Sequence, residues 1–203
     1  MLFNRLFQTV AIFALVPFCL AGASRSLPAL LLDSPTLTAS EKFVLAQITA
    51  GKSADLKSQF PEATNRVLRG AFLEALLTQS GTNVHRNGFS IEHAVFLDAV
   101  DLRNAEVHYE TGLTQCRFAG EINFSKSIFE NGLSLTGSTF EKSANFVSMK
   151  IGRLAVFDQT RFAAEMNASQ MEITGVFSVR EAHFDSPTAP VDFTSLNVGG
   201  DTL

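Results

Sequence analysis

An eleven-residue repeat constrains the fold of this chain more than any other feature of its sequence. From His85 to His183 the chain divides into nine blocks of eleven residues, and block positions 1, 5, 7 and 10 hold apolar or small side chains. These 36 positions contain no Asp, Glu, Lys or Arg, and every Phe between His85 and His183 occupies one of them. Position 1, for example, holds His85, Phe96, Val107, Phe118, Phe129, Phe140, Ile151, Phe162 and Ile173.

The spacing of these positions predicts an extended chain with frequent corners. Positions 5 and 7 are two residues apart, and so are position 10 and the next position 1, so each pair lies on one face of a β-strand. The longer intervals between the pairs leave room for a corner. On an α-helix the four positions would spread around most of the circumference, so an eleven-residue coiled coil fits poorly. We therefore expect a mainly β fold, a solenoid in which two blocks close one four-sided coil.

The repeat is interrupted once, near its end. The tenth block begins at Phe184 and is broken by the sequence SPTAP at 186–190. If three residues are inserted here, the apolar register resumes with Val191, Phe193, Leu196 and Val198. We assign residues 85–203 to the β-solenoid domain and expect a rod about 20–25 Å long. Open solenoid ends can pair with another chain, so a homodimer through the C-terminal coil is a further expectation.

The segment 38–84 predicts a helical cap for the first coil. A capping box fits Thr38–Glu41, so a helix should begin there and continue to about Ala50. A second helix should begin near Pro61, because proline is tolerated in the first turn. Its apolar stripe, Val67–Leu76, has helical spacing and must cover an apolar surface. The first coil supplies such a surface.

The first 23 residues have the features of a secretory signal peptide. Arg5 supplies the positive end, Val10–Leu20 an apolar run, and Ala21–Ala23 a small-residue cleavage site. We expect cleavage ahead of a linker over residues 24–37, and an exported product that is periplasmic or extracellular. The alternative is an uncleaved signal anchor that holds the protein on the membrane through residues 1–23. We expect no membrane span in the mature chain.

The block pattern resembles that of pentapeptide-repeat proteins, in which every fifth residue is Leu or Phe and the residue two before it is small. The matching tripeptides are Ser127–Phe129, Ser138–Phe140, Ala144–Phe146, Ala155–Phe157, Thr160–Phe162 and Ala182–Phe184. The spacing here alternates between six and five residues, so the repeat is a divergent version. The order of features also resembles a group of exported or membrane-associated pentapeptide-like proteins in which a helical segment precedes the repeats. The segments that carry this resemblance are Gly51–Leu56, Arg69–Leu77, Leu113–Phe118 and Leu135–Phe140. The resemblance implies a right-handed quadrilateral β-helix and implies no reaction.

Composition excludes several classes of function. Sixteen Lys and Arg against twenty Asp and Glu give a net charge of −4, which does not suit a strongly basic nucleic-acid-binding protein. No nucleic-acid partner is therefore expected. Two cysteines are too few for a disulfide scaffold or a cysteine zinc site. Cys116 falls in the small position 10, where it should be a buried, unreactive thiol.

The sequence offers no convergent set of catalytic or metal-binding side chains. In a 22-residue coil none of the histidines would lie above another; they are His85, His93, His108 and His183. Glu92 and His93 are adjacent, and adjacent side chains of a strand point to opposite faces. We therefore predict no catalytic, cofactor-binding or metal-binding residues and no cofactor. The same coil length places Lys150 beside Glu172, as a surface ion pair.

These observations favour a non-enzymatic exported scaffold or interaction module that presents a rigid solenoid surface to a protein or an envelope component. An alternative is a surface-tethered solenoid that binds or cleaves polysaccharides. Cleavage needs clustered carboxylates, for which Asp98, Asp101 and Glu121 are the candidates. A third class, known among pentapeptide-repeat proteins, protects topoisomerases by mimicking DNA. That class requires a cytoplasmic location and a strongly acidic face, whereas the nine blocks hold twelve acidic and nine basic residues.

Overall fold

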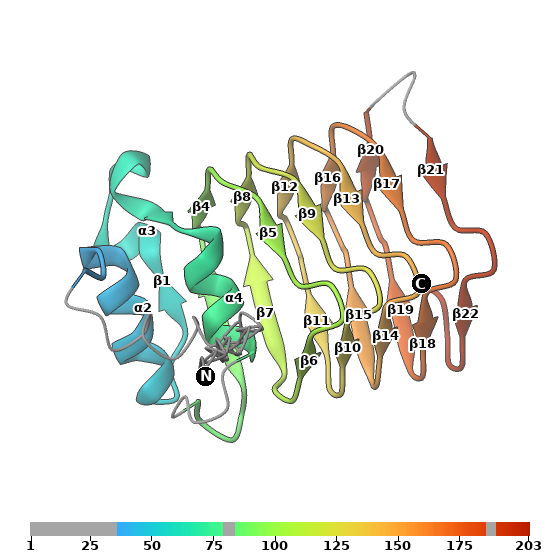
Figure 1. The fold of residues 1–203 in the computed structure, drawn as a ribbon, viewed down its shortest axis with the longest axis horizontal. Coiled ribbons are helices and arrows are strands. Elements are labelled where there is room, and N and C mark those ends of the chain that lie inside the picture. The colour runs from blue at the N-terminus through green and yellow to red at the C-terminus, as the bar shows by residue number, and fades with distance from the viewer. Residues whose placement is uncertain (1–35, 79–83, 186–189) are drawn as a thin grey trace, which may run out of the picture.

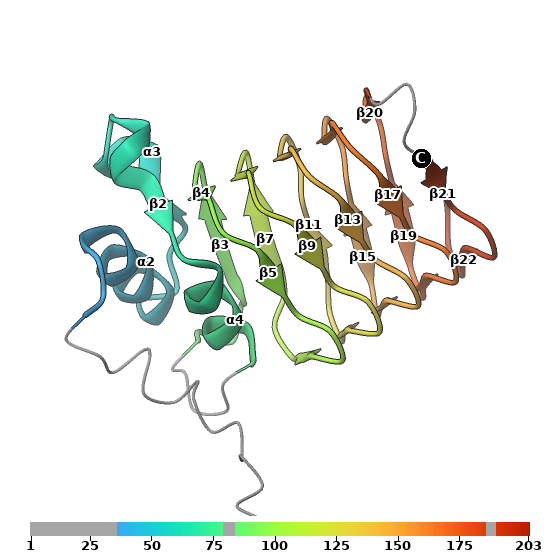
Figure 2. The same ribbon diagram turned by 45° about the horizontal axis from the view of Figure 1, so that its top comes forward.

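Four parallel β-sheets wrap around one axis and form a four-sided solenoid (Figure 1). The computed structural model describes residues 36–78, 84–185 and 190–203. The expected signal peptide and nearly all of the expected linker lie outside these residues. Helices gather at the N-terminal end of the rod, and the coils follow one another toward the C-terminus (Figures 1 and 2). The predicted mainly β fold is confirmed.

Each sheet takes one strand from every coil. Sheet A consists of β1 (Ala54–Asp55), β3 (Phe89–Glu92), β7 (Thr111–Thr114), β11 (Leu133–Ser134), β15 (Leu154–Val156) and β19 (Val176–Ser178). Sheet B consists of β2 (Val67–Leu68), β4 (Val95–Phe96), β8 (Arg117–Phe118), β12 (Thr139–Phe140), β16 (Arg161–Phe162) and β20 (His183–Phe184).

The other two faces begin one coil later. Sheet C consists of β5 (Val100–Asp101), β9 (Ile122–Asn123), β13 (Ala144–Asn145), β17 (Met166–Asn167) and β21 (Val191–Asp192). Sheet D consists of β6 (Glu106–Val107), β10 (Ile128–Phe129), β14 (Lys150–Ile151), β18 (Glu172–Ile173) and β22 (Asn197–Val198).

The register of the sheets confirms a coil of two blocks. Phe118 pairs with Phe140 and Leu133 pairs with Ala155, so partners are 22 residues apart. At the last coil Met166 pairs with Val191, a separation of 25. The predicted three-residue insertion is therefore confirmed as well.

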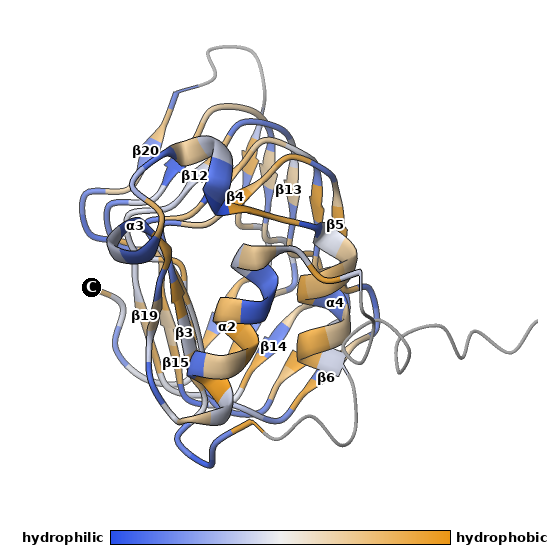
Figure 3. Ribbon diagram, turned by 90° about the vertical axis from the view of Figure 1, so that its left-hand side faces the viewer, coloured by the Kyte–Doolittle hydropathy of each residue, from blue (hydrophilic) through white to orange (hydrophobic). Residues whose placement is uncertain are grey.

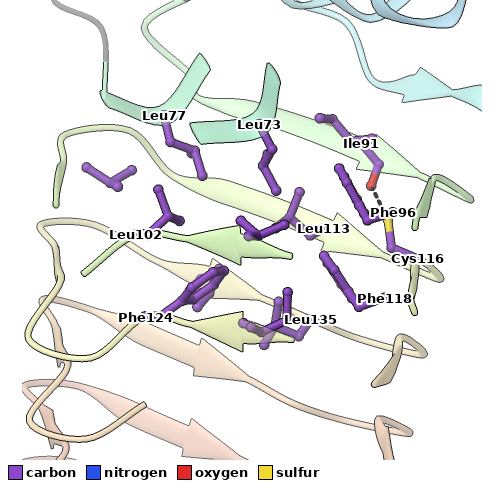
Figure 4. Close-up of a cluster of buried hydrophobic side chains, with 14 of the residues drawn as sticks. Leu73, Leu77, Ile91, Phe96, Leu102, Leu113, Cys116, Phe118, Phe124 and Leu135 are labelled. Atoms are coloured by element: carbon purple, nitrogen blue, oxygen red, sulfur yellow. Dashed lines mark hydrogen bonds between the residues drawn. The ribbon is translucent and has the colours of Figure 1, made fainter. Parts of the chain in front are cut away.

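The interior consists of the four repeated columns. Of the 36 column positions, 32 are buried and the other four are half-buried. Rings from sheet B stack in one parallel column, with centroids 4.8–5.4 Å apart and interplanar angles of 3–6°. Figure 4 shows the start of this column, with Phe96 above Phe118. Such offset ring pairs contribute beyond the area that they bury.

Buried polar side chains at position 10 are hydrogen-bonded to backbone carbonyls. Ser127 donates to the carbonyl of Phe124 in its own coil at 2.7 Å, whereas three others contact the preceding coil. Ser138 donates to the carbonyl of Leu113 at 2.8 Å, and Thr160 donates to that of Leu135 at 3.0 Å. The thiol of Cys116 makes the equivalent contact with the carbonyl of Ile91 at 3.5 Å (Figure 4). A hydroxyl can therefore occupy the dry interior without the cost of an unpaired polar group.

Block position 9 has a left-handed backbone in every block. Its φ values lie between 52° and 67°. The residues are His93, Asn104, Gln115, Lys126, Gly137, Ser148, Gln159, Gln170 and Glu181. β-branched and aromatic side chains other than His are absent from this column, as steric strain at positive φ requires. This conformation turns one corner of each half-coil.

The N-terminal helix begins as the sequence predicts. Helix α2 (Ala39–Thr49) has Thr38 as its N-cap, and the capping box with Glu41 is complete. The Thr38 N–H donates to a Glu41 carboxylate oxygen at 2.9 Å, and the Glu41 N–H donates to the Thr38 hydroxyl at 3.2 Å. The helix ends at Ala50, and Gly51 follows with φ of 69°.

The predicted second helix from about Pro61 is wrong. The chain instead forms β1, helix α3 (Leu56–Gln59), a short 3₁₀ helix η1 (Ala63–Arg66) and strand β2 before helix α4 (Gly70–Thr78) begins. The first two residues of the expected stripe, Val67 and Leu68, belong to β2 and pair with Val95 and Phe96. The cap thus supplies a partial coil of its own to sheets A and B.

Helix α4 covers the apolar mouth of the first coil. It packs against β5 and β6, while α2 lies over β1, β2 and β3. Leu73 and Leu77 point from α4 toward Leu102 and Leu113 (Figure 4). Figure 3, which views this end of the rod, shows both helices across the mouth. The predicted helical cap is therefore present, although only the part of the expected apolar stripe that follows Leu68 is helical, and it lies in α4.

A partly buried ion pair joins α2 to the residue that precedes α4. The Glu41 carboxylate is fully buried and binds the guanidinium of Arg69 through two contacts of 2.7 Å. Burial favours the neutral carboxyl, but the hydrogen bonds from Arg69 and Thr38 outweigh this effect, so the pKa of Glu41 lies below its ordinary value.

None of the helices in the described residues has the length and apolar composition of a membrane-spanning segment.

Candidate interaction surface

A groove runs over the outer face of sheet A. Its floor consists of the outward residues of successive coils, Ser90, Gly112 and Ser134, whose small side chains leave the sheet uncovered. The groove holds about 340 Å³. It is lined by Gly51, Lys52, Ser53, Asn87, Gly88, Phe89, Ser90, Glu110, Thr111, Gly112, Thr114, Gly132, Leu133, Ser134, Leu154 and Val156.

Residues from the cap and the coil corners build the two ends of this groove. The loop after α2 forms the N-terminal end, because Gly51 turns the chain at positive φ and packs against His85. A Cβ atom at Gly51 would lie 2.7 Å from the His85 ring, so only glycine fits there. Leu154, which is 41% exposed, lies at the other end. The groove therefore combines small polar groups with one apolar side chain in solvent.

Sheet C has a column of Asn and Asp on its outer face. The members are Asp101, Asn123, Asn145, Asn167 and Asp192. A side-chain oxygen of each accepts the backbone N–H of the residue two positions later, at 2.8–3.2 Å. These oxygens therefore stabilise the corner after each strand.

Ion pairs between consecutive coils cover sheets B and D. Lys150 and Glu172 are register partners and lie 2.8 Å apart, as the sequence predicts. Arg117 binds Glu141 at 2.7 Å, and this hydrogen bond lowers the pKa of Glu141. Arg161 binds Asp185. Because opposite charges alternate along these faces, they do not form the uniform acidic surface that mimicry of DNA requires.

The candidate catalytic carboxylates are held by neighbouring groups. One oxygen of Asp98 accepts the Gly70 N–H at 3.0 Å, at the start of α4. Asp101 binds Arg103 at 2.7 Å. Glu121 directly precedes β9 and is exposed. The structure therefore gives Asp98 and Asp101 structural partners, and none of these three carboxylates lines the groove on sheet A.

The histidines lie at separate places, as the coil length predicts. His108 binds Glu130 at 2.9 Å and is 58% exposed. His183 lies on the exposed strand β20, where it is the register partner of Arg161 on β16.

His93, however, lies beside Glu92 and near Asp55. This corrects the expectation that Glu92 and His93 point to opposite faces. The left-handed backbone at His93, with φ of 60°, brings the two side chains to the same side.

Cys116 is buried as the sequence predicts. Its side chain is 2% exposed. Burial raises the pKa of its thiol to about 12. The thiol therefore stays protonated at neutral pH and is a poor nucleophile.

These features define a four-sided parallel β-solenoid with an apolar interior and a helical cap. A family profile described as "Pentapeptide repeats (9 copies)" matches residues 91–139. This match and the stacked four-sided coils together support a pentapeptide-repeat protein. Comparisons with curated proteins and with solved structures gave no match. The solenoid fold indicates a structural or interaction module, and proteins of this kind are generally non-catalytic.

Proposed function

We propose that this protein is an exported, non-enzymatic scaffold that presents its solenoid surface to a protein or envelope partner. The observation that carries the proposal is the groove on sheet A. Its floor holds a small residue in three successive coils, Ser90, Gly112 and Ser134, before Val156 in the next, so its shape comes from several coils and not from one local irregularity. The hydrogen bonds and ring stacks between coils hold this surface in one shape, which lowers the ordering cost of binding.

A protein partner fits the groove better than a polysaccharide. Polysaccharides are commonly held against exposed aromatic faces, and the one aromatic residue of the lining, Phe89, is only 6% exposed. The hydroxyls of Ser90 and Ser134 and the carboxylate of Glu110 suit the backbone and polar side chains of an extended polypeptide. Leu154 offers an apolar contact beside them. Recovery of a glycan in place of a protein would support the alternative function.

The experiment compares capture by the parent protein with capture by a groove-filling variant. Ser134→Tyr should fill the floor of the groove without entering the interior, because this residue faces outward. Thr139→Tyr makes a matched change on sheet B. We expect capture of an envelope protein to be lost with Ser134→Tyr and kept with Thr139→Tyr. Equal capture by both variants would contradict a role for the groove.

Export rests on the features of residues 1–23 and has its own test. Fractionation of the expressed full-length protein, with N-terminal sequencing, should recover a soluble form that begins at Ser24. Intact protein in the membrane pellet would support the signal anchor instead. Intact protein in the cytosol would contradict export and favour an intracellular partner.

We further propose that the C-terminal coil pairs with a second copy of the chain. Among the described residues, β20, β21 and β22 each have a neighbouring strand on one side only. Phe184, Val191 and Leu203 are 39%, 39% and 55% exposed at this end. Analytical ultracentrifugation should show a dimer that Val191→Asp converts to a monomer. A monomeric parent protein at micromolar concentration would contradict the proposal.

A further inference from the structure

An aspartate, a glutamate and a histidine, all residue types that can bind metal ions, lie close together where the cap joins the first coil. Asp55 ends strand β1, and its register partner Glu92 ends strand β3. His93 follows directly. One potential ligand atom from each of these residues lies within 4.8 Å of the other two. All three residues are half-buried, so the cluster can be reached from solvent.

Neighbouring groups hold each of these side chains in place. One oxygen of Asp55 accepts the backbone N–H of Lys57 at 3.0 Å and lies 2.9 Å from the Nδ1 atom of His93. The hydroxyl of Ser53 donates to the carboxylate of Glu92. Such contacts orient ligands before a metal arrives.

The equivalent corners of the later coils on sheet A hold no histidine and at most one carboxylate each. Positions 8 and 9 there hold Thr114–Gln115, Thr136–Gly137, Asp158–Gln159 and Arg180–Glu181. The cluster is thus confined to the one coil that has a strand of the cap beside it. A second imidazole–carboxylate pair, His108 with Glu130, has the same 2.9 Å contact. It belongs to no three-residue ligand group among the described residues.

We propose that Asp55, Glu92 and His93 bind one divalent cation of the zinc class, which joins the cap to the first coil. One imidazole nitrogen and two carboxylate oxygens suit Zn²⁺, Co²⁺ or Ni²⁺ better than Ca²⁺ or Mg²⁺. Two carboxylates against one imidazole leave an excess of negative charge for the cation to neutralise. Ligands about 2.1 Å from a tetrahedral zinc lie about 3.4 Å apart. Asp55 and His93, now 2.9 Å apart, would separate slightly, and any ligand atoms farther apart, up to 4.8 Å, would move closer together. Water completes the coordination.

The test is titration of the untagged, chelator-treated protein with ZnCl₂. Isothermal calorimetry should give one site per chain, and excess Zn²⁺ should raise the melting temperature by roughly 5–10 °C. CoCl₂ should give the visible absorption of four-coordinate Co²⁺. Absence of stoichiometric binding would overturn the proposal.

Two variants and a matched control locate the site. His93→Gln should weaken zinc binding at least tenfold. Asp55→Asn should do the same while keeping the oxygen that caps α3. His108→Gln removes the comparison imidazole and should bind as the parent does. If His93→Gln does not fold, Glu92→Gln replaces it. Parent-like affinity in the ligand variants, or weakened binding in His108→Gln, would overturn the assignment.

Discussion

Truncation of Phe140 should destabilise the solenoid far more than truncation of Phe184 in the same column of rings. Phe140 is 1% exposed and stacks between Phe118 and Phe162, with ring centroids 4.8 and 5.0 Å away. Phe184 is 39% exposed and, among the described residues, stacks in parallel on Phe162 alone, at 5.4 Å. The two positions share a local pattern and differ in burial and in neighbours.

The expected losses follow from that difference. Phe→Ala at a fully buried site lowers the free energy of unfolding by about 3–5 kcal/mol, because the transfer and cavity contributions add. We expect this loss for Phe140→Ala. At the open end the surroundings can close over the missing ring, and part of the ring is already in solvent. We therefore expect about 1–2 kcal/mol for Phe184→Ala.

Urea unfolding followed by circular dichroism measures both losses. With a slope of about 3 kcal/mol per molar urea, the unfolding midpoint should fall by about 1 M or more for Phe140→Ala and by about 0.5 M for Phe184→Ala. The slope should stay unchanged if unfolding remains cooperative. Equal losses, or a larger loss at Phe184, would refute the argument that the column is stabilised from both sides, and would indicate that the terminal coil carries most of the measured stability.

Three further changes test other parts of the structure. Gly152→Ala should lower the free energy of unfolding by about 1–3 kcal/mol, because its Cβ would lie 2.0 Å from the Glu130 carbonyl oxygen; parent-like stability in thermal melts would contradict this. The lowered pKa of Glu41 stabilises the fold above the unfolded pKa of about 4.3, and this contribution is lost as pH falls through the folded pKa. Glu41→Gln leaves Arg69 without its carboxylate. In urea titrations below pH 5, the variant should therefore lack that part of the acid dependence of stability. The peptide that holds Cys116 should resist iodoacetamide at pH 8 in the native protein and react in urea, as mass spectrometry would show; native-state labelling would contradict burial of the thiol.

The interior could be predicted from the sequence because it repeats. One Phe at a given position says little, but a column such as Phe96, Phe118, Phe140 and Phe162 occurs at a fixed interval with no charged residue in register. The interval alone determines which residues are neighbours across coils. The same argument predicted the Lys150–Glu172 pair, since a 22-residue coil leaves no other register for it.

The cap strands could not be predicted in this way. Strand β2 is two residues long, and so short a segment has no periodicity of its own. Val67 and Leu68 lie at helical spacing from Ala71 and Phe72, so the local pattern predicts a helix, whereas pairing with β4 decides their conformation. This is a tertiary effect that overrides a local pattern.

The candidate metal cluster was missed for a local reason. The rule that adjacent side chains alternate holds inside a strand, but His93 lies just past the end of one, at positive φ. A signal was present in the sequence, because block position 9 contains His, Asn, Gln, Lys, Ser, Gly and Glu and no β-branched residue. Asp55, however, is 37 residues before Glu92 in the chain, and its proximity depends on strand β1.

Because the coils of the uninterrupted repeat have 22 residues each, mutation can lengthen or shorten the rod by whole coils. Within a sheet, each strand is hydrogen-bonded only to the strands one coil before and after it. Loss or duplication of 66 base pairs within the repeat would remove or add one strand in every sheet and rejoin the same register. The cap and the terminal coil would be unchanged. Recombination between neighbouring repeats can therefore alter the distance between the two ends of this protein while the register between strands is kept.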